Sequence, residues 1–149
     1  MEFELPKLIE KEISIGLNGI ITYSNLQSKD EQLGYSISID GEPLFGFEEG
    51  DWQEGWYVIG RDTLCGDPIF VDLNGRDIPV FTAMHGMGEW QEICISGTYE
   101  GFLKSLSKLE DESDRNLSDN DTRIVLKEIK NYIGDAHLEF WERIIRIKI

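Results

Sequence analysis

The spacing of apolar residues changes at Gly97, and this change constrains the fold more than any other feature of the sequence. Before Gly97, apolar side chains alternate with polar ones over short segments, which is the pattern of half-buried β-strands. After Gly97, apolar side chains recur every three or four residues, which is the pattern of amphipathic helices. The chain is therefore predicted to have a strand-rich front and a helical back.

Short segments in the front part are predicted strands, and turn residues rather than helices separate them. This arrangement indicates a largely antiparallel sheet. Asn18-Gly19 predicts a two-residue hairpin, and Asp40-Gly41 and Asn74-Gly75 predict further turns. Leu5–Lys11 can begin a short helix, and Ser24–Gln32 is a predicted polar loop. The predicted strands are Ile13–Leu17, Ile20–Tyr23, Tyr35–Ile39, Leu44–Phe47, Trp56–Gly60, Pro68–Leu73, Val80–Ala83 and Glu92–Ile95.

Amphipathic helices are predicted after Gly97. Thr98 can cap the first, Ser118 or Asp119 the second and Asp135 the third, while Gly134 ends the second. Their apolar stripes are Phe102, Leu106 and Leu109 with Leu103 beside them, then Leu126, Ile129 and Ile133, then Leu138, Trp141 and Ile145. We expect a single α+β domain over residues 1–149, in which a twisted, largely antiparallel sheet is covered on one face by the helical part at 98–149.

Acidic residues outnumber basic ones by 29 to 14, which gives a formal charge of −15. Such a charge repels phosphate backbones, so we expect no direct binding of nucleic acid. It attracts a basic protein and speeds the encounter with it, although solubility alone is the simpler explanation. The segment Asp40–Asp67 carries a net −7, because its eight acids face one base, Arg61. This segment is the first place to look for a partner surface.

Trp52 lies within the acidic loop, and two interpretations of it stay open. An exposed indole surrounded by acids suits a protein interface, since Trp is a frequent hot-spot residue and burial beside unpaired carboxylates is costly. Alternatively, Trp52 folds back onto the sheet. Trp56, Trp90 and Trp141 fit core or helix-packing positions. The residues predicted to bind a partner are Glu48, Glu49, Asp51, Trp52, Glu54, Asp62 and His85.

No catalytic site is predicted. Cys65, His85 and a nearby Asp have the residue types of a nucleophile, a base and an orienting group, but such sets arise by chance in most domains. The simpler role of His85 is to hold its loop by a hydrogen bond or to contact a partner. Cys65, Cys94, His85 and His137 lack the close paired spacing of a zinc site, so no metal and no cofactor is expected.

The sequence also indicates a cytoplasmic location. Two cysteines are too few for a disulfide scaffold, and neither a signal peptide nor an apolar run long enough to cross a bilayer is visible.

Several short motifs in the middle of the chain resemble the SUKH superfamily. They are Trp56–Asp62, Gly66–Leu73, Ile78–Phe81, His85-Gly86 and Trp90–Leu103, and the resemblance covers roughly residues 35–104. The family includes bacterial immunity proteins of polymorphic toxin systems, the yeast Smi/Knr cell-wall regulators and the bacterial Syd protein. The family positions expected to be structural are Trp56, Gly60, Gly66, Asp67, Pro68, Asp72, Pro79, Trp90 and Phe102.

The resemblance implies an α+β fold and a function in binding other proteins. The hypothesis that follows is a non-enzymatic immunity-type protein that neutralises a basic toxin domain, for which a nuclease is the candidate. The alternative is a regulatory or scaffold domain whose partner is not a toxin. The sequence leaves the oligomeric state open.

Overall fold

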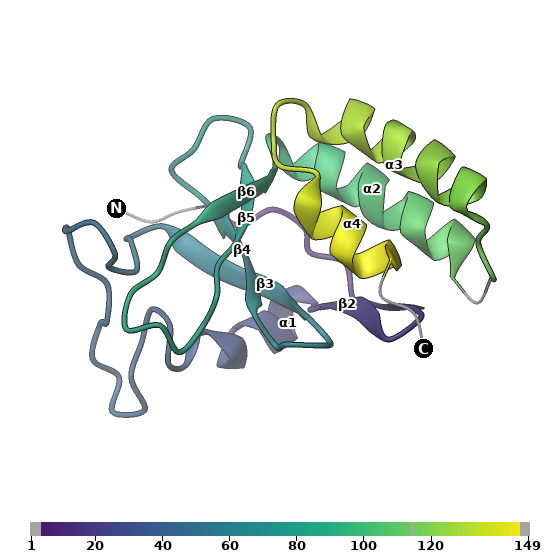
Figure 1. Ribbon diagram of the computed structural model, residues 1–149. Coiled ribbons are helices and arrows are strands. Elements are labelled where there is room, and N and C mark those ends of the chain that lie inside the picture. Colours follow the sequence, from purple (N-terminus) through teal and green to yellow (C-terminus); the bar gives the residue numbers. More distant parts are fainter. Residues whose placement is uncertain (1–3, 114, 147–149) are drawn as a thin grey trace.

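Antiparallel pairing of consecutive strands builds the sheet. The computed structural model describes residues 4–113 and 115–146. Within these ranges the sheet follows the order of the sequence, β1-β2-β3-β4-β5-β6, and each strand pairs antiparallel with the next (Figure 1). The strands are β1 Lys11–Ile15, β2 Asn18–Thr22, β3 Trp56–Asp62, β4 Pro68–Asp72, β5 Val80–Thr82 and β6 Ile93–Ser96. The predicted α+β class and the largely antiparallel sheet are confirmed.

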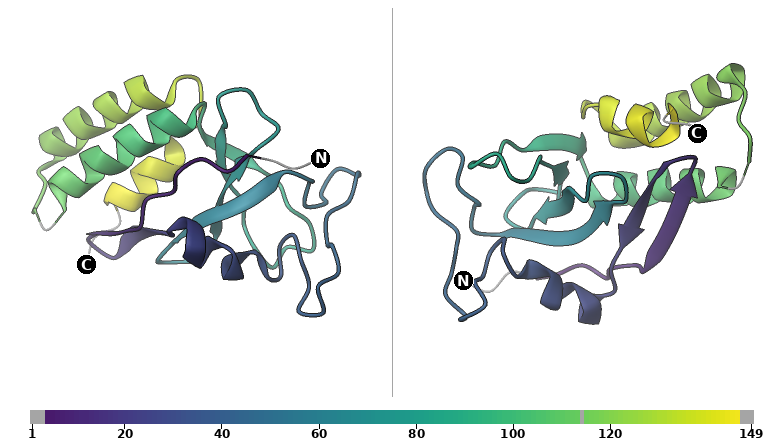
Figure 2. Two further views of the ribbon diagram at one scale, coloured as in Figure 1. Left: turned by 180° about the vertical axis from the view of Figure 1, so that it is seen from behind. Right: turned by 60° about the horizontal axis from the view of Figure 1, so that its bottom comes forward.

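Three helices from the C-terminal part lie together on one face of the curled sheet (Figures 1 and 2). They are α2 Tyr99–Glu112, α3 Asp119–Ile133 and α4 Glu139–Arg146. Two short elements follow β2, namely α1 Asn25–Ser28 and a 3₁₀ turn at Asp30–Gln32. The polar loop predicted at 24–32 therefore contains helical turns, and the short helix considered at 5–11 does not form.

Both faces of the sheet are buried, and β4 shows this most clearly. Ile69 and Val71 face the helices, while Phe70 between them faces the opposite side. The core under the helices contains Ile13, Ile20, Ile59, Ile95, Phe102, Leu106, Leu109, Ile129, Ile133 and Trp141. The second core contains Tyr23, Trp52, Trp56, Val58, Phe70 and Ala83. The long connection between β2 and β3, which begins with the short helix α1, lies on the side away from α2–α4 (Figure 2).

Capping residues set the ends of α2 and α3. The hydroxyl of Thr98 accepts from the N–H of Gly101 at 2.9 Å, and Ser118 forms a capping box with Asp121, so both predicted caps are confirmed. Gly134, with φ 69°, ends α3 as predicted. The predicted cap at Asp135 is wrong, because α4 begins only at Glu139. The last three residues of the expected helical part lie outside the described ranges.

The first hairpin turns two residues earlier than predicted. Ile15 pairs with Asn18, so the loop is Gly16-Leu17, and Gly16 supplies the positive φ of 63°. Asn18 and Gly19 instead begin β2. Gly19 is needed there because a Cβ would overlap the carbonyl oxygen of Ile13 across the ladder.

The predicted strands at 35–39 and 44–47 do not join the sheet. This segment closes on itself, with the N–H of Leu44 donating to the carbonyl of Ser36 at 2.9 Å and that of Ser38 to the carbonyl of Glu42 at 2.8 Å. Asp40-Gly41 does turn the chain, with φ 84° at Gly41. The alternation of apolar residues was therefore misleading, because Ile39 and Leu44 face solvent rather than a core.

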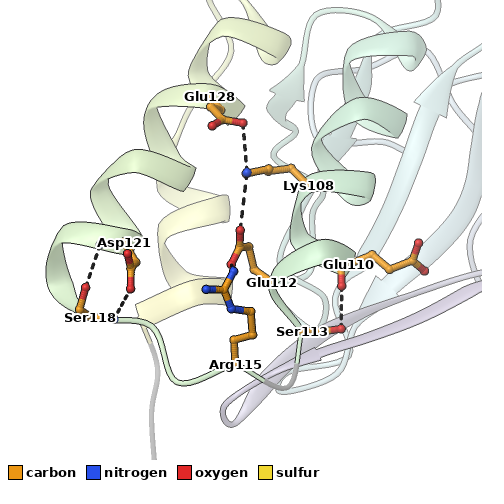
Figure 3. A network of polar contacts seen from close by, with 8 residues as sticks. All are labelled: Lys108, Glu110, Glu112, Ser113, Arg115, Ser118, Asp121 and Glu128. Atoms are coloured by element: carbon orange, nitrogen blue, oxygen red, sulfur yellow. Dashed lines mark hydrogen bonds and ion pairs between the residues drawn. The ribbon is translucent and has the colours of Figure 1, made fainter.

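A polar network joins the C-terminal end of α2 to α3 (Figure 3). Lys108 contacts Glu112 at 3.5 Å and Glu128 at 3.2 Å, and Arg115 contacts Glu112 at 2.8 Å. The carboxylate of Glu112 is buried near the negative end of the helix dipole, so the two cations offset an otherwise unfavourable charge. The hydrogen bond from Lys108 to Glu128 raises the pKa of the lysine.

Gly101 is predicted to be essential for packing α2 against α3. A Cβ at Gly101 would overlap the backbone oxygen of Tyr132. We expect Gly101→Ala to lower the free energy of unfolding by about 1–2 kcal/mol, since overpacking outweighs the better helix propensity of alanine. Gly97→Ala at the same junction is the control, because its Cβ would lie 3.5 Å from the Ile133 oxygen, an ordinary contact. Urea unfolding measures both, and an unchanged or raised stability for Gly101→Ala contradicts the packing.

The capping box of α3 gives a pH-dependent prediction. Hydrogen bonds from the side chain and the backbone of Ser118 lower the pKa of the Asp121 carboxyl. A depressed pKa in the folded state means that the cap stabilises the fold above the usual aspartate pKa and is lost as pH falls through the lowered value. Carboxyl ¹³C NMR titration is expected to show this lowered pKa and its return toward about 3.9 in Ser118→Ala. An identical Asp121 titration in both proteins contradicts the capping geometry.

Candidate functional site

A cluster of acids lies on the long connection between β2 and β3, together with several exposed apolar side chains. Between Lys29 and Arg61 the sequence has eight acids and no base. We define the acidic loop surface by its exposed side chains, which are Ile39, Asp40, Glu42, Phe47, Glu48, Glu49 and Glu54. Phe47 is 89% exposed and Ile39 90% exposed.

Trp52 holds this loop on the sheet. Its side chain is only 2% exposed, and its Nε1–H donates to the carbonyl of Trp56 at 3.2 Å. Ring centroids of Trp56, Phe70 and Trp90 lie 5.3, 4.7 and 5.3 Å from the Trp52 ring. The interpretation of Trp52 as an exposed partner-binding residue is wrong, and the alternative that it folds back onto the sheet is correct.

Burial of Trp52 does not draw its acidic neighbours into the core. Glu49 and Glu54 remain exposed, and Asp51 is half-buried. The carboxylate of Asp51 accepts from the N–H of Glu48 at 3.1 Å, and the carbonyl of Trp52 accepts from the N–H of Gly46 at 2.9 Å. The loop therefore turns tightly enough for the indole to be buried while the side chains of Glu49 and Glu54 remain in solvent.

Gln32 is a second anchor, which sequence reasoning missed. Its buried amide accepts from the N–H of Val58 at 2.9 Å and donates to the carbonyl of Val58 at 2.8 Å. It therefore pairs with β3 as a neighbouring strand would, where β2 no longer runs alongside. A glutamine in a polar stretch gives no signal of this role before the fold is known.

Phe47 is the other residue that the sequence did not identify. It was assigned to a strand, where alternate apolar side chains would be buried. In the structure it follows Gly46 at the bend and precedes Glu48 and Glu49. An almost fully exposed aromatic ring beside two carboxylates has the character of an interface anchor, the role first considered for Trp52.

Asp62 is not available to a partner. It is 4% exposed, and its Oδ1 accepts from the N–H groups of Cys65 at 2.7 Å and Gly66 at 3.3 Å. The carboxylate therefore closes the turn between β3 and β4, a common role of aspartate in turns. The assignment of Asp62 as a partner-binding residue is corrected accordingly.

His85 is exposed and anchored at one side. Its Nδ1 lies 2.6 Å from Oδ1 of the buried Asp67, which also accepts from the backbone N–H of His85 at 3.1 Å. The Asp67 carboxylate thus fixes the start of the connection after β5. Of the considered triad, the structure joins His85 to Asp67, and among the hydrogen bonds of the described residues none joins Cys65 to His85.

The remaining motif positions occupy structural places. Trp56, Pro68 and Phe102 are buried, Trp90 is half-buried, and Gly66 has φ 75°. A Cβ on Gly60 would overlap the carbonyl oxygen of Ile21, so close pairing of β2 and β3 requires glycine there. Asp72 accepts from the N–H of Asn74 at 2.9 Å, and Pro79 directly precedes β5. In residues 4–113 and 115–146, no group of three or more His, Cys, Asp or Glu side chains could hold a metal.

Comparison with known proteins adds no identification. No family model matches the chain, and no curated protein or solved structure shows significant similarity to it. The resemblance to the SUKH superfamily therefore stays a prediction from the motifs. None of the described helices has the length and apolar character needed to cross a membrane.

Substitutions of Trp52 and Phe47 by alanine are predicted to have very different effects on the free energy of unfolding. Trp52→Ala removes a buried indole, and we expect it to lower the free energy of unfolding by about 3–5 kcal/mol. Phe47→Ala, in the same loop, is the control and should change it by no more than about 0.5 kcal/mol. Urea unfolding followed by circular dichroism measures both. Equal effects of the two substitutions would contradict the assigned burial.

Proposed function

We propose that this chain is a non-enzymatic protein-binding domain that recognises a basic partner through the acidic loop surface. The observation that carries the proposal is the nearly complete exposure of Phe47 beside Glu48 and Glu49 in a loop anchored by Trp52 and Gln32. An exposed aromatic anchor supplies apolar contact area, and the surrounding carboxylates steer a positively charged protein toward it.

The anchoring of the loop matters for affinity. A loop that must be ordered on binding loses conformational entropy at that moment, whereas a loop already held in place loses less. The Trp52 indole and the Gln32 amide both contact the sheet through backbone hydrogen bonds, so the acids are carried on a surface that is formed before binding.

We further propose that the partner is a toxin domain and that the chain is an immunity-type protein. The resemblance of residues 35–104 to the SUKH superfamily supports this role, and a charge of −15 suits competition for a surface that grips nucleic acid. A nuclease domain is therefore the class of toxin that we favour. The alternative is a regulatory domain with a non-toxin partner, and the following experiment distinguishes it from an immunity-type protein.

The test is co-expression with a toxin domain encoded beside the gene, read as rescue of growth and as affinity of the purified pair. We expect Phe47→Ala and Glu49→Lys each to weaken binding at least about tenfold, as loss of a hot spot or reversal of a steering charge should. We also expect the on-rate to fall steeply between about 0.01 M and about 1 M salt, where the screening length shrinks from about 30 to about 3 Å.

Matched controls lie on the helices. Ile124→Ala on α3 and Glu139→Lys on α4 change an exposed apolar and an exposed acidic residue away from the loop, and both should leave binding unchanged. Equal weakening by controls and loop variants would contradict the assigned surface. Binding of a basic protein without toxicity or rescue would favour the regulatory alternative.

A further inference from the structure

A groove lined by two methionines lies on the connection between β5 and β6. Its volume is about 310 Å³, and its lining residues are Met84, Met87, Glu89, Gln91, Glu92 and Ile93. Met84 is 57% exposed and Met87 is 63% exposed, so their thioethers are in contact with solvent rather than with the core. Methionine side chains adapt to irregular apolar partners and recur at surfaces that bind varied peptides.

The loop that carries the groove is held at both ends. His85 is bound to the buried Asp67 at 2.6 Å, and the N–H of Trp90 donates to the carbonyl of Gly50 at 2.8 Å. Between these two points, Gly86 and Gly88 have φ of 77° and 80° and flank Met87. The positive φ values that glycine permits therefore set the turns around Met87.

The two charged side chains that line the groove are both negative. Glu89 and Glu92 contribute to its lining, and the sequence contains no lysine or arginine from Asp77 to Leu103. Glu89 also lies against Gly50, where an added Cβ would come within 3.1 Å of it. The acids of the groove thus adjoin the acidic loop surface, and a cationic occupant would meet both.

We propose that this groove binds a short apolar segment flanked by lysine or arginine, presented by the partner protein. The inference rests on the proposed function in taking the basic partner as the occupant. The methionines and Ile93 provide the apolar floor, and Glu89 and Glu92 pair with the flanking cations. The same acids repel the phosphates of nucleic acids and of anionic membranes, which disfavours both as occupants.

Methionine-methyl NMR tests the groove directly, because the chain has three methionines and two of them line it. The probe is an eight-residue peptide of alternating leucine and lysine, added to protein carrying ¹³C at the methionine ε-methyls. We expect saturable shifts of the Met84 and Met87 signals. A peptide with serine for leucine should bind at least about tenfold more weakly, since each lost apolar side chain removes buried area.

Replacement of lysine by glutamate in the probe should abolish the shifts. Glu92→Lys should weaken the leucine–lysine peptide about tenfold or more, whereas the control Glu139→Lys should not. Static methionine signals, or equal binding of the serine peptide, would overturn the proposal. Shifts of the same signals by vesicles of anionic phospholipid or by a single-stranded oligonucleotide would overturn the choice of a protein occupant.

A second measurement separates failure of this inference from failure of the proposed function. The double variant Met84→Gln, Met87→Gln alters two exposed side chains, so its unfolding free energy should change by no more than about 1 kcal/mol. We expect it to bind the toxin domain at least about tenfold more weakly. If it binds normally while Phe47→Ala fails, the groove inference alone is overturned. If the toxin domain never binds, the proposed function fails, and the peptide titration still decides the groove.

Discussion

The indole of Trp52 packs between the second face of the sheet and the connection after β5, and much of the described surface depends on that contact. Without it, Phe70 and Trp56 would each lose an aromatic contact. The single donor of the indole is satisfied by the carbonyl of Trp56, so the ring is buried without an unpaired polar atom. Trp90 packs on the same ring and binds Gly50 through its backbone, which joins the two loops.

The separation of charge from apolar surface follows from this contact. Folding the indole inward leaves the nearby carboxylates of Glu48, Glu49 and Glu54 in solvent, where they keep their hydration. Repulsion between these carboxylates destabilises the folded loop, and the aromatic packing of Trp52 offsets this destabilisation. The result is an ordered surface with a high density of negative charge and few cations of its own, which is an arrangement suited to a cationic partner.

The elements set by local chemistry were predicted well from the sequence. Helices α2 and α3 have their caps at Thr98 and Ser118 and bury the apolar stripes predicted for them, because capping and the helical period act within a few residues. Strands β3 to β6 were also placed correctly. The first hairpin was shifted, because Asn18-Gly19 has the chemistry of a turn but serves the pairing of β1 and β2.

The candidate site was predicted only in outline. The sequence indicated an exposed acidic loop, and its acids are mostly exposed. It did not indicate which aromatic residue pointed outward, because Trp52 and Phe47 both lie beside acids and only the fold of the loop distinguishes them. Gln32 bonds to the backbone of Val58, which is distant in sequence, and Asp62 bonds to backbone N–H groups across its own turn. Residue type alone does not reveal such partners.

The central claim is that the acidic loop is a fixed surface held on the sheet by Trp52. Hydrogen exchange of the indole N–H groups, followed by NMR, tests it most directly. The account predicts that the Trp52 indole exchanges as slowly as that of Trp141, whose Nε1–H donates to the carbonyl of Ile95 in the main core at 2.8 Å. Exchange of the Trp52 indole at the rate of a solvent-exposed tryptophan would contradict it.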